Sequence, residues 1–413
     1  MNMSSFETRA QFITDFARRL HLAGVSAARL EGAVKSTAES IGVACEIWYS
    51  PTGILLSLGE PGSDTGQQTR VMRLEPAEPD LSDLVRLDEV AEDVIAGRID
   101  VAEASKQLRE LDRAPDRQQN TWTVIAFGLA SAAVAALLRT SWLDIAVAGA
   151  LGLIIGMISI AARTRPHLSV ASEAIAAIVA TVLAAAFAHF IAPLSIQTVV
   201  IASLIVLMPG LSLSTAVNEL ASRQLVTGTA RFSGAMVVLF KLTFGSVAGA
   251  QIVNALGWVP RTSSATLLPA IVEGVAMIAA AFSFAILFRA ARRDIALVMG
   301  SAVMGYVLTR LTSGWFAPSE GVNFAGGVFF SSLVMAALAN LYGRVARRPG
   351  TLVRLPAIML LVPGSVGFRG LASLMERDYT LGMDTALAVL TALVALMAGL
   401  MFGSVLVPPR RYL

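Results

Sequence analysis

Apolar residues dominate the chain from Trp122 onward, in long segments separated by short polar connections. Each segment is roughly 20 residues long, the length of α-helix that crosses the hydrocarbon core of a bilayer. The pattern predicts ten membrane-spanning helices, at residues 122–138, 142–162, 170–191, 196–220, 230–256, 266–288, 295–310, 322–342, 352–374 and 384–407. We therefore expect an α-helical polytopic membrane protein.

The first 118 residues have a different pattern, with frequent charges and the periodicities of a soluble module. Apolar residues at helical spacing predict helices, and short apolar runs on either side of the turn at Pro51, Thr52 and Gly53 predict strands. The expected helices lie at 6–21, 26–41, 81–96 and 101–111, and the expected strands at 43–49, 54–58 and 69–74. The sequence thus predicts a small α+β domain at residues 1–118, before the membrane region.

Composition and charge support a membrane protein with a soluble portion. Charged residues make up 15% of the chain and hydrophobic residues 55%, whereas soluble domains carry roughly a quarter charged residues. The net charge of +3 does not indicate a nucleic-acid partner. The arginines cluster in every second loop between the predicted spans, which is the pattern of cytoplasmic loops under the positive-inside rule. These inner connections hold Arg163, Arg165, Arg223, Arg231, Arg289, Arg292, Arg293, Arg344, Arg347 and Arg348, and the tail holds Arg410 and Arg411. With no apolar signal-peptide core at the N-terminus, both termini and the α+β domain are expected in the cytoplasm.

Two pairs of segments resemble each other at a nearly constant separation. LDIAVAGALGLIIG, from Leu143, aligns with RDIALVMGSAVMGY, from Arg293, at an offset of 150 residues. The Pro-Gly pairs at Pro209 and Pro363 are 154 residues apart. Chance similarity between apolar helices could explain one such match, but two matches favour a duplicated transporter fold. Each half holds an odd number of spans, so residues 119–260 and 261–413 are expected to form two inverted five-helix repeats.

Both Pro-Gly pairs lie inside apolar segments, in LIVLMPGLSLSTAV and MLLVPGSVGF. Proline has no N–H and interrupts the hydrogen bonds of a helix, so the freed backbone groups need partners inside a bilayer. We expect helices four and nine to be broken, with the N-terminal ends of the following half-helices binding a carboxylate near the midplane. The alternative is that each proline only kinks its span. The candidate substrate-binding residues on these segments are Pro209, Gly210, Ser212, Ser214, Thr215, Asn218, Pro363, Gly364, Ser365 and Arg369.

Ionisable side chains within the spans are costly, so they indicate cavities or paired partners. Lys241 lies near the centre of span five and is a further candidate for binding the substrate. Glu173, Glu219 and Glu273 are candidates for proton coupling, because a buried carboxyl can exchange protons near neutrality. An interfacial or structural role is the alternative for each of these acids.

No motif for a metal, a nucleotide or an organic cofactor is present in the sequence. Cys45 and His21 could be imagined as a thiol nucleophile and its base, but a lone cysteine in a strand is more often a small buried hydrophobe. We therefore expect no enzyme activity and no cofactor. Without an ATP site, transport would be driven by ion or substrate gradients. Two alternative functions are a channel and a signalling protein whose soluble module binds a ligand. The chain could also form a homo-oligomer.

Several stretches resemble the bacterial threonine/serine exporter family: HLAGVSAARLEGAVKSTAESIGV, YSPTGI, DVAEASKQL, LMPGLSLSTAVNEL and LVPGSVGFRGL. The resemblance covers nearly the whole chain. It implies export of small amino acids across the inner membrane, driven by the proton gradient, and a cytoplasmic N-terminal part for which hydrolase activity has been suggested. Relatives divided into two subunits are associated with succinate export, so a dicarboxylate is the alternative substrate. Carried over to this chain, the transport core comprises Pro209, Gly210, Asn218, Glu219, Pro363, Gly364 and Arg369.

Overall fold

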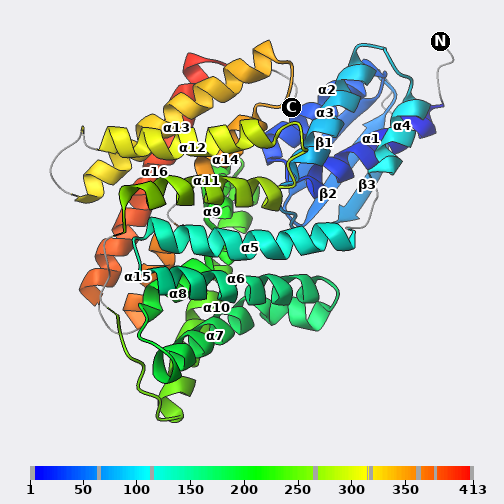
Figure 1. Cartoon of the computed structure of the whole chain (residues 1–413). Helices are drawn as coiled ribbons and strands as arrows, with labels where there is room; N and C mark the ends of the chain where they lie inside the picture. Colours follow the sequence, from blue (N-terminus) through cyan, green and yellow to red (C-terminus); the bar gives the residue numbers. More distant parts are fainter. Residues whose placement is uncertain are drawn as a thin grey trace.

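The structure is a computed structural model, drawn in Figure 1. It describes residues 5–62, 67–111, 116–263, 268–313, 315, 320–359, 364–375 and 379–409.

The N-terminal elements are four helices and one three-stranded sheet. The helices are α1 (Phe6–Leu22), α2 (Ala27–Ser40), α3 (Leu81–Ile95) and α4 (Val101–Glu110). The strands β1 (Ala44–Ser50), β2 (Gly53–Gly59) and β3 (Gln68–Arg73) pair antiparallel in the order β1-β2-β3. Three helix starts are capped by short polar side chains, those of Ser5, Asp80 and Asp100. Each side chain accepts a hydrogen bond from a backbone N–H in the first turn of its helix, as such residues commonly do.

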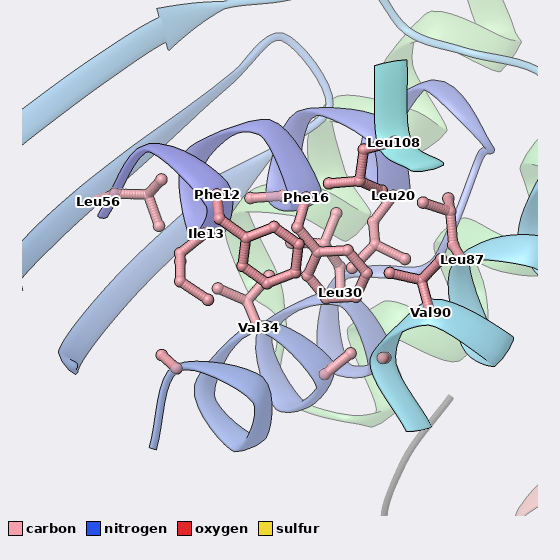
Figure 2. Close-up of a cluster of buried hydrophobic side chains, with 14 of the residues drawn as sticks. Phe12, Ile13, Phe16, Leu20, Leu30, Val34, Leu56, Leu87, Val90 and Leu108 are labelled. Carbon is pink, nitrogen blue, oxygen red and sulfur yellow. The ribbon is translucent and has the colours of Figure 1, made fainter. Parts of the chain in front are cut away.

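These elements enclose one apolar core (Figure 2). Phe12 and Phe16 of α1 stack with ring centroids 6.0 Å apart and are fully buried. Leu30 of α2, Leu56 of β2 and Leu87 of α3 belong to the same buried cluster. The apolar faces of these helices therefore meet in one core, as amphipathic helices require, and α3 also packs Leu81 and Val85 against the membrane region.

The rest of the described chain is mostly apolar helix. Seven helices have the length and hydropathy to cross a membrane: α5 (Arg117–Leu137), α6 (Trp142–Arg163), α7 (Pro166–Phe190), α10 (Leu225–Ala255), α12 (Ile295–Ser313), α13 (Glu320–Val345) and α16 (Tyr379–Leu406). An eighth candidate is a bent pair with a 52° angle, made by α8 (Ile196–Ser203) and, after the short 3-10 turn η1 (Ile205–Leu207), α9 (Gly210–Ala221). The polytopic membrane architecture is thereby confirmed, whereas the number ten stays a prediction.

The described residues of the second part of the chain form three further helices. They are α11 (Ala270–Leu287), which is apolar but short, α14 (Thr351–Met359) and α15 (Gly364–Met375). The second Pro-Gly pair lies between α14 and α15, and its proline, Pro363, is outside the described residues.

The helical bundle has two distinct ends. At one end, which we call the N-terminal side, Arg163 in the last turn of α6 lies 3.9 Å from Glu78, and Arg293 just before α12 lies 2.7 Å from Glu89. At the opposite end, which we call the far side, Glu273 of α11 contacts Arg310 in the last turn of α12. Helix α6 therefore runs toward the N-terminal elements and α12 runs away from them (Figure 1).

Helices α5 and α11 pack against each other. Arg139, just after the end of α5, lies 3.2 Å from Glu273 in the first turn of α11. At the other end, the backbone carbonyl of Phe288, just after α11, accepts a hydrogen bond from Leu81 of the N-terminal elements. The two helices are therefore antiparallel.

Candidate functional site

The first break in the helices comes at Pro209. Helix α8 ends at Ser203, a single 3-10 turn follows, and Pro209, with φ −80° and ψ 40°, precedes the first residue of α9. The N–H of Gly210 donates to the carbonyl of Met208 at 2.8 Å. Within the described residues no side chain caps the start of α9. The first N–H groups of α9 therefore form an electropositive helix end inside the bundle.

The polar residues predicted on α9 differ in their availability. Ser214 is buried, and its hydroxyl donates to the carbonyl of Gly210 at 3.2 Å. Ser212, Thr215 and Asn218 are half-buried. The hydroxyl of Ser214 is thus used within the helix, and the other three are the better candidates for contact with a ligand.

The helix that begins at Gly364, after the second Pro-Gly pair, lies close to α9. Gly364 begins α15, Ser365 follows it with a side chain outside the described part, and Arg369 is exposed. Helix α15 packs against α8, α9 and α10, and α9 packs against α16. The two helices that follow the Pro-Gly pairs therefore lie against each other, although the pairs are 154 residues apart in sequence.

Lys241 pairs with an acid within the bundle. Its Nζ lies 3.4 Å from Oε2 of Glu173, joining α10 to α7, and both side chains are partly exposed. The pair satisfies two charges that would each be costly alone inside a bilayer.

Glu219 lies near the end of α9, at the contact with the N-terminal elements. Its side chain is 3% exposed. Oε2 accepts from Nε of Arg231 at 3.0 Å, and Oε1 accepts from the backbone N–H of Ala27 at 3.3 Å. Ala27 is the first residue of α2, so the carboxylate occupies a helix N-terminus, where negative charge is favoured.

Glu273 is on the far side of the bundle. It accepts from Arg139 and Arg310, and the hydroxyl of Tyr306 donates to it at 3.2 Å. The three acids proposed for proton coupling thus occupy three separate environments: a pair within the bundle, a contact with the N-terminal elements and a cluster on the far side.

Two buried aspartates occupy equivalent positions in the matching segments that start at Leu143 and Arg293, and they are not among the predicted site residues. Asp144 accepts from the backbone N–H of Ser195 at 2.9 Å, just before α8. Asp294 forms a bidentate pair with Arg348, with N–O distances of 2.6 and 2.8 Å, shortly before α14. Each aspartate therefore fixes the approach to the helix that precedes a Pro-Gly pair. The 150-residue offset between them was the only sequence signal of this role.

The N-terminal elements contact both halves of the membrane region. On the first half, the hydroxyl of Thr227 donates to the carbonyl of Tyr49 at 3.1 Å, beside the Glu219 contact. On the second half, Arg289 lies 3.1 Å from Asp80, and Arg29 donates to the hydroxyl of Thr351. Sequence patterns missed these contacts, because each joins segments more than 150 residues apart.

The N-terminal elements do not present an activated nucleophile at Cys45. Burial raises the pKa of its thiol to about 11, although Lys35 acts in the opposite direction. His21 is buried, with Nε2 at 2.7 Å from the carbonyl of Glu75, and burial lowers the pKa of its imidazole. A reactive cysteine needs a lowered pKa, so Cys45 has the properties of a packing residue. Among the described residues, no group of three or more metal-ligating side chains occurs.

Comparison with known proteins gives matches along most of the chain. Residues 11–253 match the family model described as "Putative threonine/serine exporter", and residues 273–406 match the one described as "Threonine/Serine exporter, ThrE". No solved structure matches.

Several of the curated relatives are fungal proteins whose name describes a membrane protein. "Pheromone-regulated membrane protein 10" of Debaryomyces hansenii is 26% identical over 87% of this chain and 36% of its own length. The proteins of the same name from Pichia sorbitophila and Candida albicans are 26% and 25% identical, over 89% and 87% of this chain and 37% and 33% of their own lengths. The chain therefore spans about a third of the length of these relatives.

Proposed function

The chain belongs to the threonine/serine exporter family, and we propose that it exports threonine and serine from the cytoplasm by secondary transport. The observation that carries this proposal is the contact between α9 and α15, the helices that begin after the two Pro-Gly pairs. In duplicated transporters, half-helix ends of this kind bind the anionic group of the substrate. The substrate carboxylate would lie between the starts of α9 and α15.

The side chains near these helix starts suit a small amino acid. Thr215 is the sixth residue after Pro209, and Arg369 is the sixth residue after Pro363. One break thus carries a hydroxyl and the other a guanidinium at the same place along its half-helix. The guanidinium of Arg369 would pair with the carboxylate, while Ser212, Thr215 and Asn218 would bind the polar groups of threonine or serine.

The packing of the helices supports a duplicated architecture. In the first half, α8 packs against α6 and α10 packs against α7. At the equivalent places in the second half, α14 packs against α12 and α16 packs against α13. Across the two halves, the contact between α10 and α15 recurs as that between α16 and α9. The opposite directions of α6 and α12 support an inverted relation between residues 119–260 and 261–413.

Backbone geometry adds a second, independent similarity. Arg139 and Arg289, 150 residues apart, both have positive φ, 57° and 51°, although neither is glycine. Each follows the first helix of its proposed repeat and precedes a buried aspartate by five residues, Asp144 or Asp294. The same uncommon turn at equivalent positions favours duplication over chance similarity.

For proton coupling we propose Glu173 ahead of Glu219 and Glu273. Glu173 is the one of these three that pairs with a lysine inside the bundle, at Lys241. Protonation of Glu173 would release Lys241 for the substrate, and deprotonation would restore the pair. The proposed location is a bacterial inner membrane, with both termini and the N-terminal elements in the cytoplasm.

A dicarboxylate such as succinate is the second candidate substrate. The observation that favours it is a cationic side chain in each half that is not buried, Lys241 and Arg369. A dicarboxylate would need two cations, whereas threonine and serine need one.

Counterflow in proteoliposomes tests both candidates. Vesicles loaded with unlabelled threonine, serine or succinate are placed in labelled substrate, with and without a proton gradient. Accumulation with threonine and serine that responds to the gradient supports the proposal, and accumulation with succinate alone supports the alternative. Flux that does not saturate would indicate a channel and contradict both.

A further inference from the structure

An ion-pair cluster joins the two halves on the far side of the bundle. Glu273, in the first turn of α11, accepts hydrogen bonds from Arg139, just after α5, and from Arg310, in the last turn of α12. We call these three residues the far-side cluster. Its carboxylate is largely withdrawn from solvent, because the side chain of Glu273 is 18% exposed. Arg139 belongs to the first half and Glu273 to the second, so separation of the halves on the far side has to break these bonds.

An inverted relation between the halves predicts a matching connection on the N-terminal side. Arg289 is the counterpart of Arg139, because it follows α11 as Arg139 follows α5, 150 residues earlier, and both have positive φ. At the same offset, the counterpart of Glu273 is Thr123. Thr123 carries no charge, and its hydroxyl donates to the carbonyl of Gln119 within α5. The first half therefore supplies no acid for Arg289 at this position.

The N-terminal elements supply that acid instead. Oδ2 of Asp80, the N-cap residue of α3, lies 3.1 Å from Nη1 of Arg289, and the side chain of Asp80 is 11% exposed. We call Asp80 and Arg289 the N-terminal-side pair. The next residue, Leu81, donates its N–H to the carbonyl of Phe288 at 2.9 Å, and both residues belong to one buried apolar cluster. The start of α3 is thus fixed to the end of α11 by an ion pair, a backbone hydrogen bond and apolar packing.

The N-terminal elements are also attached to the first half. Glu219 of α9 accepts the N–H of Ala27 in α2, and Thr227 of α10 donates to the carbonyl of Tyr49 in β1. Helices α2 and α3 pack against each other. The N-terminal elements therefore connect α9 and α10 of the first half to α11 of the second. Each end of the bundle thus has a connection between the halves, directly on the far side and through the N-terminal elements on the other.

We propose that the N-terminal elements form a gate that closes the N-terminal side of the transport path, with the start of α3 as its releasable contact. This inference rests on the proposed function, since a transporter with inverted repeats moves one part against the other around a fixed site. Opening toward the N-terminal side would break the N-terminal-side pair and keep the far-side cluster, and opening toward the far side would do the reverse. Weakening one connection would favour opening at that end and closure at the other, because the populations of the states follow the difference in their interactions.

The test measures the access of a thiol reagent to each end of α11 and needs no substrate. Two cysteines are introduced separately into the full chain carrying Cys45→Ala. They are Ala285→Cys, four residues before Arg289, and Ala276→Cys, three residues after Glu273. Both alanines are buried, 0% and 4% exposed, so fast labelling requires the respective end to open. The protein is placed in lipid nanodiscs with a charged maleimide, and the rate of labelling is followed by mass spectrometry.

The variants weaken one connection at a time. Asp80→Asn removes the charge of the N-terminal-side pair but keeps a side chain that caps a helix well. Arg289→Gln breaks the same pair from the side of α11, so the test stands even if Asp80→Asn destabilises α3. Glu273→Gln weakens the far-side cluster. The matched control is Asp93→Asn, which removes a charge from the same helix α3, where Asp93 lies 2.6 Å from the exposed Arg98.

We expect Asp80→Asn and Arg289→Gln to accelerate labelling of Ala285→Cys about fivefold or more, the lower end of ordinary coupling between sites, and to slow labelling of Ala276→Cys. Glu273→Gln should give the opposite pattern, and Asp93→Asn should leave both rates unchanged. If neither Asp80→Asn nor Arg289→Gln accelerates labelling of Ala285→Cys, or if both ends accelerate together, the gate is overturned. Reciprocal labelling without threonine counterflow would keep the gate and refute the proposed substrate, whereas counterflow without reciprocal labelling would refute the gate alone.

Discussion

Glu219→Gln tests the buried ion pair between α9 and α10, whose carboxylate also accepts the backbone N–H of Ala27 in the N-terminal elements. The carboxylate of Glu219 is almost fully buried, and the side chain of its partner Arg231 is 15% exposed. Removing one member of a buried pair costs about 3–5 kcal/mol, because the other charge is left uncompensated. The amide oxygen of glutamine can still accept one hydrogen bond, and Arg231 keeps some contact with solvent. We therefore expect a loss of about 2–3 kcal/mol in the free energy of unfolding.

The assay is a double-mutant cycle with Arg231→Gln, in detergent micelles. Unfolding by guanidinium chloride is followed by tryptophan fluorescence, and the coupling energy is taken from the single and double variants. The control cycle uses Lys35 and Glu46, which form an exposed pair at 2.8 Å, with side chains 41% and 82% exposed. Such pairs contribute about 0–1 kcal/mol. A coupling between Glu219 and Arg231 no larger than the control would refute the reasoning that these two side chains form a buried, stabilising pair between α9 and α10.

Three further predictions concern the proposed site and the thiol. Arg369→Gln should lower threonine counterflow about tenfold or more, as loss of a charge-assisted bond implies, while the amount of folded protein stays unchanged. Arg98→Gln is the matched control. Normal counterflow in Arg369→Gln would argue against a role of Arg369 in binding the substrate. Pro209→Ala combined with Gly210→Ala should let α9 extend toward its N-terminus, remove the free helix start and abolish counterflow, so retained flux would mean that this helix start is dispensable. Alkylation of Cys45 by iodoacetamide at pH 7 should be about a hundredfold slower than for an ordinary thiol, as a pKa near 11 rather than 9.0 implies. The rate should rise with pH up to about 11, and rapid labelling at pH 7 would contradict the burial of this thiol.

The secondary structure could be predicted closely where a periodic pattern and a local cap coincide. The strands expected at 43–49, 54–58 and 69–74 occur at Ala44–Ser50, Gly53–Gly59 and Gln68–Arg73. The first membrane helix was expected to begin at residue 122, but it begins at Arg117, after Asp116. Hydropathy registers only the apolar part of a helix, so a polar first turn is missed.

The first break could be predicted from Pro209, but its form could not. The helix before it ends at Ser203, six residues earlier, and a 3-10 turn fills most of the interval. The residues 204–208 are apolar and carry no helix-ending signal of their own, so the early end of α8 reflects tertiary packing. The predicted second break, at Pro363, lies outside the described residues and stays a prediction.

The partners of the ionisable residues could not be predicted from any local sequence pattern. The sequence indicated that Lys241 needs an acid or a cavity, and the structure supplies Glu173. For Glu219, however, the partner on the N-terminal elements is Ala27, 192 residues away, and the group it contributes is a backbone N–H, which has no sequence signature. Position along a span therefore predicts that a charge needs a partner, but only the fold identifies the partner.

In the proposed transport site, the helix starts after Pro209 and Pro363 jointly bind the substrate carboxylate. The most direct measurement is a density map of the chain in lipid nanodiscs with saturating threonine. We expect ligand density between the starts of α9 and α15, with the carboxylate facing both helix ends and Arg369 nearby. Ligand density elsewhere, or an unbroken helix through either Pro-Gly pair, would contradict it.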